Sequence, residues 1–295
     1  MSDAPWAAWA RRATIVVAAL AAGCAAPLEP SAPACDDAAL ESGRSYFYVM
    51  NLLALAGPEG DAPPFTSVGF NIDGDAVVAC NGHIVGESAE FAGQDPDNGS
   101  GIDNAFGGDL GNEVNAVLQG NIDAGSTLIL VEVRGVDDLA NDSCVEVSVF
   151  PGALPAGTTV PMTDGAGRLA AGQTFDILPA TFSDPSRIID GRVESERTAV
   201  PLTLPLLGPG FPVLHLRAPQ VRFDISADGI SRGVFGGSMD TEEVITALID
   251  FPLPFHGWIF DIRSLRGLAD LDEDGNPSTC EAASVALKFS GVTAL

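Results

Sequence analysis

The sequence predicts a mainly β protein, with antiparallel sheets in a sandwich and two or three short helices. Three observations lead to this fold class. Several stretches alternate large apolar and polar residues, which is the period-two pattern of half-buried strands. Glycine (33 residues) and proline (21 residues) are frequent among the 295 residues and separate these stretches as turns do. An internal repeat divides the folded part into two similar halves.

The first strands follow from local patterns. Residues 46–53 are an almost continuous apolar run, which is typical of a central strand. In residues 144–150 the valines at alternate positions share one face. We expect this segment to pair with residues 128–136 through the acidic turn at residues 137–142.

The middle of the chain has shorter strand-like segments that turn residues interrupt. Residues 151–220 are rich in Pro and Gly, with strand-like pieces near residues 192–207 and 213–217. Proline cannot donate a ladder hydrogen bond, so the prolines in this region predict edge strands and turns.

The internal repeat relates about residues 68–136 to residues 221–292. The matched pairs are 68–75 with 221–228, Phe106-Gly107-Gly108 with Phe235-Gly236-Gly237, and 130–136 with 286–292. Each glycine pair leads into an amphipathic segment, and in the second half Asp240 and Glu243 resemble a capping box. Each half is therefore predicted to contain a strand, a Phe-Gly-Gly turn, a short helix and a strand.

The N-terminal segment predicts export. Arg11 and Arg12 precede an apolar run, residues 13–22, that ends at Gly23 and Cys24. The run is shorter than the roughly 20 residues needed to span a bilayer, so it is typical of a signal peptide. It resembles the lipobox of bacterial lipoproteins, which implies cleavage before Cys24 and lipidation of that cysteine. An ordinary signal peptide cut nearby is the alternative.

Three regions follow from this leader: a signal peptide at 1–23, a lipidated cysteine with a tether at 24–34, and a single β-rich domain at 35–295. Prolines at positions 27, 30 and 33 of the tether have the period of a polyproline II helix. The predicted location is the cell envelope, at the outer membrane, with membrane contact through the N-terminal lipid alone.

Composition limits the partners. The formal net charge is −26, which disfavours nucleic acid and anionic membrane surfaces and favours cations. A hydrophobic content of 46% predicts a packed core despite this charge. A protein or glycan ligand of unknown identity is the expected partner.

Four cysteines remain after Cys24: Cys35, Cys80, Cys144 and Cys280. In an oxidising compartment four cysteines allow three pairings. The pairing we prefer joins Cys80 to Cys144 and Cys35 to Cys280, because the second bond would connect the two ends of the domain.

An acidic loop near the C-terminus predicts a calcium site. It matches the D-x-D-x-D-G pattern of EF-hand-type loops, in which alternate oxygens converge on one ion. The expected ligands are Asp270, Asp272, Asp274, Asn276 and Glu281. A weaker version uses Asp95, Asp97 and Asp103. A solvated acidic turn without an ion is the alternative at both places.

No catalytic residue is assigned. Residues 229–233 match G-x-S-x-G, and Asp250 and His256 follow in the order of an α/β-hydrolase triad. A nucleophile elbow needs a helix directly after the serine, whereas glycine-rich sequence follows Ser231. We interpret the motif as a turn between strands, and His215 as a packing residue of a strand.

Several segments together resemble predicted myxobacterial-type lipoproteins. They are the lipobox and the sequences GFNIDGD, GIDNAFGG, GVDD, VRFDISADG and DLDEDG…C…SVALKF. The resemblance implies the export route and the repeat, and it implies no activity. The leading hypothesis is a non-enzymatic, calcium-stabilised envelope lipoprotein. A secreted hydrolase of carbohydrates or esters is the alternative.

Overall fold

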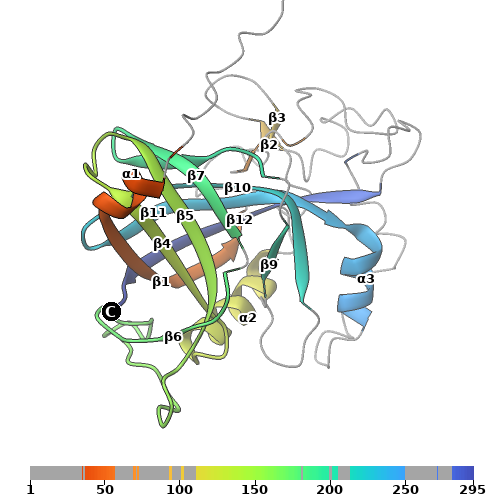
Figure 1. The fold of residues 1–295 in the computed structure, drawn as a ribbon. Coiled ribbons are helices and arrows are strands. Elements are labelled where there is room, and N and C mark those ends of the chain that lie inside the picture. Colours follow the sequence, from red (N-terminus) through yellow and green to blue (C-terminus); the bar gives the residue numbers. More distant parts are fainter. Residues whose placement is uncertain are drawn as a thin grey trace, which may run out of the picture. The chain divides into compact units, whose positions relative to one another are not determined.

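Antiparallel strands dominate the computed structural model of the protein (Figure 1). It describes residues 35, 37–56, 69–70, 72, 93–94, 101–102, 111–180, 182–198, 201–204, 213–249, 271 and 281–295. The helices are α1 (Asp37–Ser42), α2 (Gly111–Asp123) and α3 (Thr241–Ile249). The strands are β1 (Arg44–Leu55), β2 (Gly93–Gln94), β3 (Gly101–Ile102), β4 (Leu128–Val136), β5 (Asp142–Ala153), β6 (Asp176–Ile177), β7 (Phe182–Ile189), β8 (Arg192–Ser195), β9 (Leu202–Leu204), β10 (Leu214–Ser226), β11 (Gly229–Asp240) and β12 (Ala282–Thr293).

Eight of these strands close into one barrel. The order β11-β12-β1-β4-β5-β7-β8-β10 returns to its start because β10 also pairs with β11. All of these pairings are antiparallel. The mainly β, antiparallel class is thus confirmed, whereas a sandwich is not confirmed. The long strand β10 explains the closure, since it pairs with β8 on one side and β11 on the other, which leaves no free edge.

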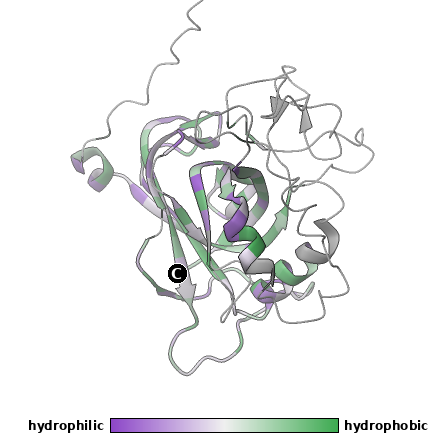
Figure 2. Cartoon of the chain, turned by 90° about the vertical axis from the view of Figure 1, so that its right-hand side faces the viewer, coloured by the Kyte–Doolittle hydropathy of each residue, from purple (hydrophilic) through white to green (hydrophobic). Residues whose placement is uncertain are grey.

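Aromatic side chains fill the barrel interior. The ring of Phe289 stacks on that of Phe235 at 4.4 Å between centroids and meets Phe223 edge-on at 5.9 Å. The hydroxyl of the fully buried Tyr48 donates to the carbonyl of Ser226, 2.7 Å away. Figure 2 shows how hydrophobic and hydrophilic residues alternate along the strands. An eight-stranded barrel is just wide enough for side chains to fill, and here they do.

The barrel has two ends that differ in what surrounds them. We call one the disulfide end, which carries the β4–β5 loop, the β7–β8 turn and the β10–β11 turn. Backbone hydrogen bonds connect these three segments at this end. The N–H of Gly191 donates to Ala140 O at 2.8 Å, and the N–H of Ile225 donates to Gly191 O at 2.9 Å. The helix end carries α2 and α3; Asn115 of α2 accepts the N–H of Leu55, the last residue of β1. In Figure 1 the disulfide end lies on the left, beside α1.

The predicted elements are largely present. Helix α2 has the expected spacing and buries Leu118 and Ile122. The capping prediction for α3 is confirmed, because Asp240 Oδ1 accepts the N–H of Glu243 at 2.9 Å. The repeat partners at 130–136 and 286–292 are strands β4 and β12, which lie on either side of β1.

The Phe-Gly-Gly turn of the second half is a wrong prediction. Residues 235–237 lie inside β11 and pair with β12. Phe235 enters the core, and a Cβ on Gly237 would come within 2.7 Å of the Leu216 side chain, so this glycine permits a close approach between strands. The equivalent residues 106–108 of the first half lie outside the described residues.

A second, smaller apolar cluster covers the outer face of β11 and β12. Its buried members are Ala56, Phe70, Ile72, Val234, Leu271, Ala282 and Ala286. The segments around residues 70 and 271, which are distant in sequence, therefore meet on the outside of the barrel.

No helix within the described part of the chain has the length and apolar character needed to cross a membrane. The described residues all belong to one compact unit, Ala32–Leu295. The predicted signal peptide, Cys24 and the tether at 24–34 lie outside the described residues.

Candidate functional site

A charged depression opens on the outer face of the barrel near the disulfide end. Its volume is about 370 Å³. The residues that line it are Arg187, Ile189, Asp190, Arg192, Glu194, Asp224 and Arg232. They come from β7, the β7–β8 turn, β8, β10 and β11. A pocket of this size accommodates a small ligand or one polar group of a larger ligand.

Strand register arranges the charges in alternation. Arg187 faces Glu194 across β7 and β8, and Glu194 faces Arg222 across β8 and β10. In the neighbouring row Arg192 faces Asp224. Directly opposed residues of an antiparallel pair lie close enough for their side chains to interact. Each carboxylate of this sheet face therefore has arginine neighbours, and the four arginines outnumber the two carboxylates. We call this set of six residues the charge lattice: Arg187, Arg192, Glu194, Arg222, Asp224 and Arg232.

Asp224 holds two guanidinium groups. Arg192 Nε lies 3.2 Å from Asp224 Oδ1, and Arg232 binds Asp224 Oδ2. The Arg192 and Arg232 side chains remain 44% and 73% exposed, whereas that of Asp224 is 20% exposed. The more buried carboxylate thus orients two arginines that face solvent.

Local backbone irregularities place these arginines. Asp190 and Gly191 both have positive φ (51° and 77°), as a tight type I′ hairpin requires, and Arg192 follows directly. In β11 the register shifts between Ile230 and Gly233, so that Ser231 and Arg232 are both exposed although they are consecutive. Arg232 has a φ of 49°, which is uncommon for a residue with a Cβ. This bulge brings Arg232 to Asp224.

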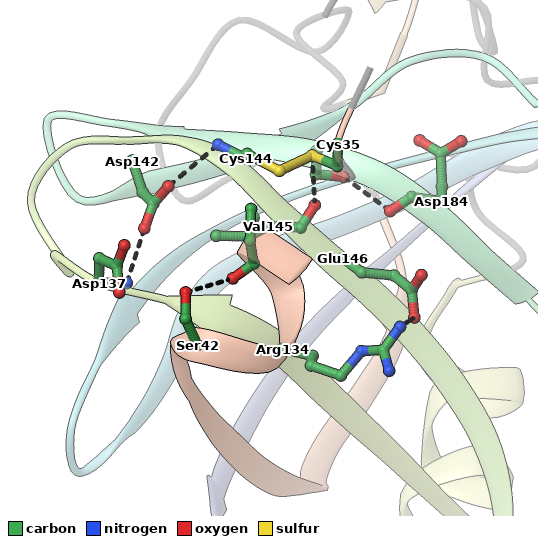
Figure 3. Close-up of a disulfide and its surroundings, with 11 residues drawn as sticks. Cys35, Ser42, Arg134, Asp137, Asp142, Cys144, Val145, Glu146 and Asp184 are labelled. Atoms are coloured by element: carbon green, nitrogen blue, oxygen red, sulfur yellow. Dashed lines mark hydrogen bonds and ion pairs between the residues drawn. A yellow bond between two sulfur atoms is a disulfide. The ribbon is translucent and has the colours of Figure 1, made fainter. Parts of the chain in front are cut away.

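The disulfide near this end corrects the preferred pairing. Cys35 is bonded to Cys144, with their Cα atoms 5.3 Å apart, so the prediction of Cys80 with Cys144 and Cys35 with Cys280 is wrong. Figure 3 shows the bond joining the chain just before α1 to the start of β5. The reason is topological, because β5 passes beside the segment that leads into β1. Cys80 and Cys280 lie outside the described residues.

Asp142 orders the backbone next to this disulfide (Figure 3). Its Oδ1 accepts the N–H of Cys144 at 3.0 Å, and its Oδ2 accepts that of Asp137 at 2.7 Å. The acidic turn at residues 137–142 is therefore confirmed as the β4–β5 connection, and its carboxylates hold the loop shape.

Asp184 is a buried carboxyl group on the interior face of β7. It is 9% exposed, and its Oδ2 has no hydrogen-bond partner among the described residues. The pKa of Asp184 is raised to about 6, chiefly by burial; a hydrogen bond from the Glu196 N–H opposes the shift, and the negative charge of Glu196 adds to it. A perturbed pKa often marks a functional group, but Asp184 is enclosed in the barrel wall and does not line the depression.

The structure brings together the two ends of the predicted calcium loop. Leu271 N–H donates to Ala282 O at 3.1 Å, and Glu281 N–H donates to Leu271 O at 3.2 Å. Asp270, Asp272, Asp274 and Asn276 lie outside the described residues. At the weaker loop, β2 and β3 pair on either side of residues 95–100. Asp95, Asp97 and Asp103 also lie outside the described residues. Within the part of the chain that is described, no group of three or more metal-binding side chains is found.

The G-x-S-x-G segment lies at a hairpin, not at a strand-to-helix turn. Residues 227–228 form the β10–β11 turn, and Ser231 lies on β11, which runs on to Asp240 before α3 begins. A Cβ on Gly233 would come within 2.6 Å of the Phe289 ring, so this glycine makes room for a core aromatic. The motif thus has a packing explanation. Asp250 and His256 lie outside the described residues.

His215 is not a packing residue as predicted. Its side chain is 49% exposed, and its Nδ1 lies 2.8 Å from Glu243 Oε1, which also accepts the His215 N–H at 3.0 Å. It connects the start of β10 to α3 instead, because it lies where β10 has left the barrel wall for the helix end.

Sequence reasoning missed the charge lattice. A signal was present, because Arg192-Val193-Glu194 and Arg222-Phe223-Asp224 have the same pattern of an arginine, an apolar residue and a carboxylate. In a strand this spacing places both charges on the outer face and the apolar residue in the core. The register that aligns the two patterns could not be deduced from either of them.

Fold and depression together define a closed antiparallel β-barrel with a filled interior and a charged depression on its outer face. Comparison with known protein families, with curated proteins and with solved structures finds no match for this chain.

Proposed function

We propose that the protein is an exported, lipid-anchored envelope protein whose calcium-stabilised β-barrel binds a ligand on its outer surface and catalyses no reaction. The main observation in support of this proposal is that Phe223, Phe235 and Phe289 fill the barrel interior, while a depression of about 370 Å³ opens on the outer face. A filled interior disfavours carriage of a lipid inside the barrel. The outer depression offers charged groups that can recognise a polar ligand.

The lipid anchor is supported by the residues before Cys24, where Arg11, Arg12 and the apolar run precede Gly23. The disulfide adds a mechanical argument. Cys35, the first described residue after the proposed tether at 24–34, is bonded directly to the barrel wall at Cys144. A force on the tether would therefore act on β5 without first unfolding α1.

Calcium binding is supported by the closed ends of the acidic loop. In an EF-hand-type loop the first and twelfth positions bind the same ion, so they must lie close together. The Leu271–Ala282 bridge places the chain on either side of residues 272–280 in contact. The proposed ligands are Asp270, Asp272, Asp274, Asn276 and Glu281, and the weaker loop would use Asp95, Asp97 and Asp103.

The anchor is tested by metabolic labelling with an alkyne fatty acid in a Gram-negative host. We expect label on the wild-type protein and none on Cys24→Ser, and we expect Cys80→Ser to be labelled like the wild type. Label on Cys24→Ser would contradict the anchor.

The calcium site is tested by thermal unfolding of the mature protein with excess calcium or with a chelator. An ion present at about ten times its dissociation constant stabilises the folded state by about 1.4 kcal/mol. We expect chelation to lower the Tm by about 3–5 °C. Asp272→Asn should remove the response, whereas Asp138→Asn, in the β4–β5 loop, should retain it. Equal melting with and without calcium would exclude a stabilising ion.

The hydrolase alternative is tested with a panel of glycoside and ester substrates. We expect no turnover above background. Turnover that is lost in Ser231→Ala would contradict the non-enzymatic proposal.

A further inference from the structure

We propose that the depression binds an oxyanion of the phosphate type, held between the guanidinium groups of Arg187 and Arg232. This inference deepens the proposed function, since it names the ligand chemistry of the outer binding surface. It rests on three observations: the concentration of arginine, the way Asp224 orients Arg192 and Arg232, and the position of Arg187.

This concentration of arginine is unusual for this chain. The sequence has 14 Lys and Arg residues against 40 Asp and Glu residues, yet the charge lattice contains four arginines and two carboxylates. Asp190 in the adjacent turn adds a third carboxylate to the lining. The lining therefore has Arg187, Arg192 and Arg232 against three carboxylates and is formally neutral. On a molecule that is otherwise strongly negative, an anion is repelled less here than elsewhere.

The hydrogen-bond inventory also favours an anion. A guanidinium group has five N–H donors and no acceptor. Arg192 and Arg232 share the two oxygens of Asp224, so their donors outnumber the acceptors between them. Arg187 lines the depression from β7, and its side chain forms no hydrogen bond or ion pair within the described part of the chain. Phosphate oxygens match the planar fork of arginine in two-point hydrogen bonds.

Preorganisation explains why carboxylates are present at an anion site. A mobile arginine loses rotamer entropy when it binds, and a fixed one loses less. Asp224 is the least exposed member of its triad and holds Arg192 and Arg232 in place before any ligand arrives. Arg222 is held separately, with its guanidinium carbon 5.2 Å from the centre of the Phe70 ring.

Two sources could supply the oxyanion: a soluble phosphate ester or a phospholipid headgroup. Cys35, which follows the proposed tether, lies near the same end of the barrel as the depression. The test therefore includes phospholipid headgroups among the probes. The overall charge of −26 repels an anionic surface, but this repulsion is screened over about 8 Å at physiological salt.

The test is titration calorimetry on the chain from residue 24 onward, with Cys24→Ser so that no lipid is attached. The probes are inorganic phosphate, glucose 6-phosphate, and vesicles of phosphatidylcholine with or without phosphatidylglycerol. We expect at least one phosphate probe to bind, with an affinity that falls as salt rises. Binding of both soluble probes identifies a free phosphate group as sufficient, whereas binding of the phosphatidylglycerol vesicles alone identifies a headgroup.

The variants locate the site. Arg187→Gln and Arg232→Gln should each weaken binding about tenfold, because each removes charge-assisted hydrogen bonds. Arg217→Gln and Arg134→Gln are matched controls; each removes an exposed arginine that is paired with a carboxylate elsewhere, with Asp240 and with Glu146. The controls should bind within twofold of the parent, and unchanged melting temperatures show that all four variants fold.

Three results would overturn the proposal: no binding of any phosphate probe, equal binding by both site variants and the parent, or equal losses in the site and control variants. In these cases the charge lattice serves only to stabilise the sheet. The lipid anchor and the calcium site would be unaffected, because their tests do not involve these arginines, whereas ligand binding at the depression would lose its support.

Discussion

At the residue scale, Asp184 should make the folding stability depend on pH in an unusual direction. Its pKa is raised from 3.8 to about 6 in the folded state, so the folded state binds this proton more tightly than the unfolded state does. The contribution of Asp184 to stability is therefore fully present below about pH 4 and is lost as the pH rises to about 6. The expected loss is on the order of 3 kcal/mol.

The measurement is the free energy of unfolding of the wild type and of Asp184→Asn at pH 4.5 and pH 8. The asparagine is uncharged, so the variant should be relatively more stable at pH 8 than at pH 4.5. Asp164→Asn is the control and should differ from wild type by the same amount at both pH values, because hydrogen bonds from the backbone N–H groups of Arg168 and Ala166 lower the pKa of Asp164, which is then ionised at pH 4.5 and at pH 8. A difference between Asp184→Asn and wild type that does not change with pH would contradict the assignment.

Gly233 offers a second test at this scale. A methyl group there would overlap the Phe289 ring in the core, so we expect Gly233→Ala to destabilise the protein by about 1–3 kcal/mol. Gly120, in helix α2, has open space around it, and Gly120→Ala should stabilise by about 0.5–1 kcal/mol. Urea unfolding of the two variants measures both. A stabilised Gly233→Ala would show that the ring and the glycine are not in contact.

Single residues also mark the limit of sequence reasoning. The alternation of Val145, Val147 and Val149 and the cap formed by Asp240 are local patterns, and both are confirmed. Arg232 was missed because its role depends on a bulge in β11 and on the register with β10. Neither is encoded in the residues adjacent to it.

At the scale of elements, the Cys35–Cys144 bond ties α1 to the β4–β5 region. Leu40 of α1 packs on Gly135, where a Cβ would lie 2.8 Å from Leu40 Cδ2. The two cysteines are 109 residues apart, and a disulfide across so long a loop typically contributes about 2–4 kcal/mol. We expect the double variant Cys35→Ser with Cys144→Ser to lose this amount in denaturant unfolding. The same double variant measured with a reducing agent is the control, since any further loss then comes from a bond between the remaining cysteines.

The remaining cysteines give a further prediction. Because Cys35 is bonded to Cys144, we expect Cys80 to pair with Cys280 in the oxidised protein. Phe70 and Ile72 pack in one cluster with Leu271 and Ala282, which brings the flanking segments of both cysteines together. Peptide mapping without reduction should recover both bonds. A peptide that joins Cys80 to Cys144 would contradict the pairing in the structure.

Element types were easier to predict than their connections. The apolar runs predicted β1, β4, β5 and β12, because burial of alternate residues is a local property. The Phe-Gly-Gly turn was wrong because glycines serve close packing in β11 as well as they serve a turn. Of the calcium loop, only Leu271 and the residues from Glu281 onward are described, so that prediction stands as a proposal.

At the scale of the whole molecule, the closed barrel determines where a ligand can bind. Local patterns predicted an antiparallel β fold but not closure, since closure depends on β10 pairing with β8 and β11 at once. In the closed barrel, aromatic side chains fill the interior and the side chains of the charge lattice lie on the outer surface. The charge lattice exists only because four strands align in one register.

The most direct test of binding on the outer surface is solution NMR of the ¹⁵N-labelled chain from residue 24 onward, titrated with glucose 6-phosphate. We expect amide shifts to change in residues 187–194 and 224–232, and to stay constant for Phe289 in the core and for α3 at the helix end. Changes centred on the core or on the helix end, or no change at saturating ligand, would contradict a binding surface at the charge lattice.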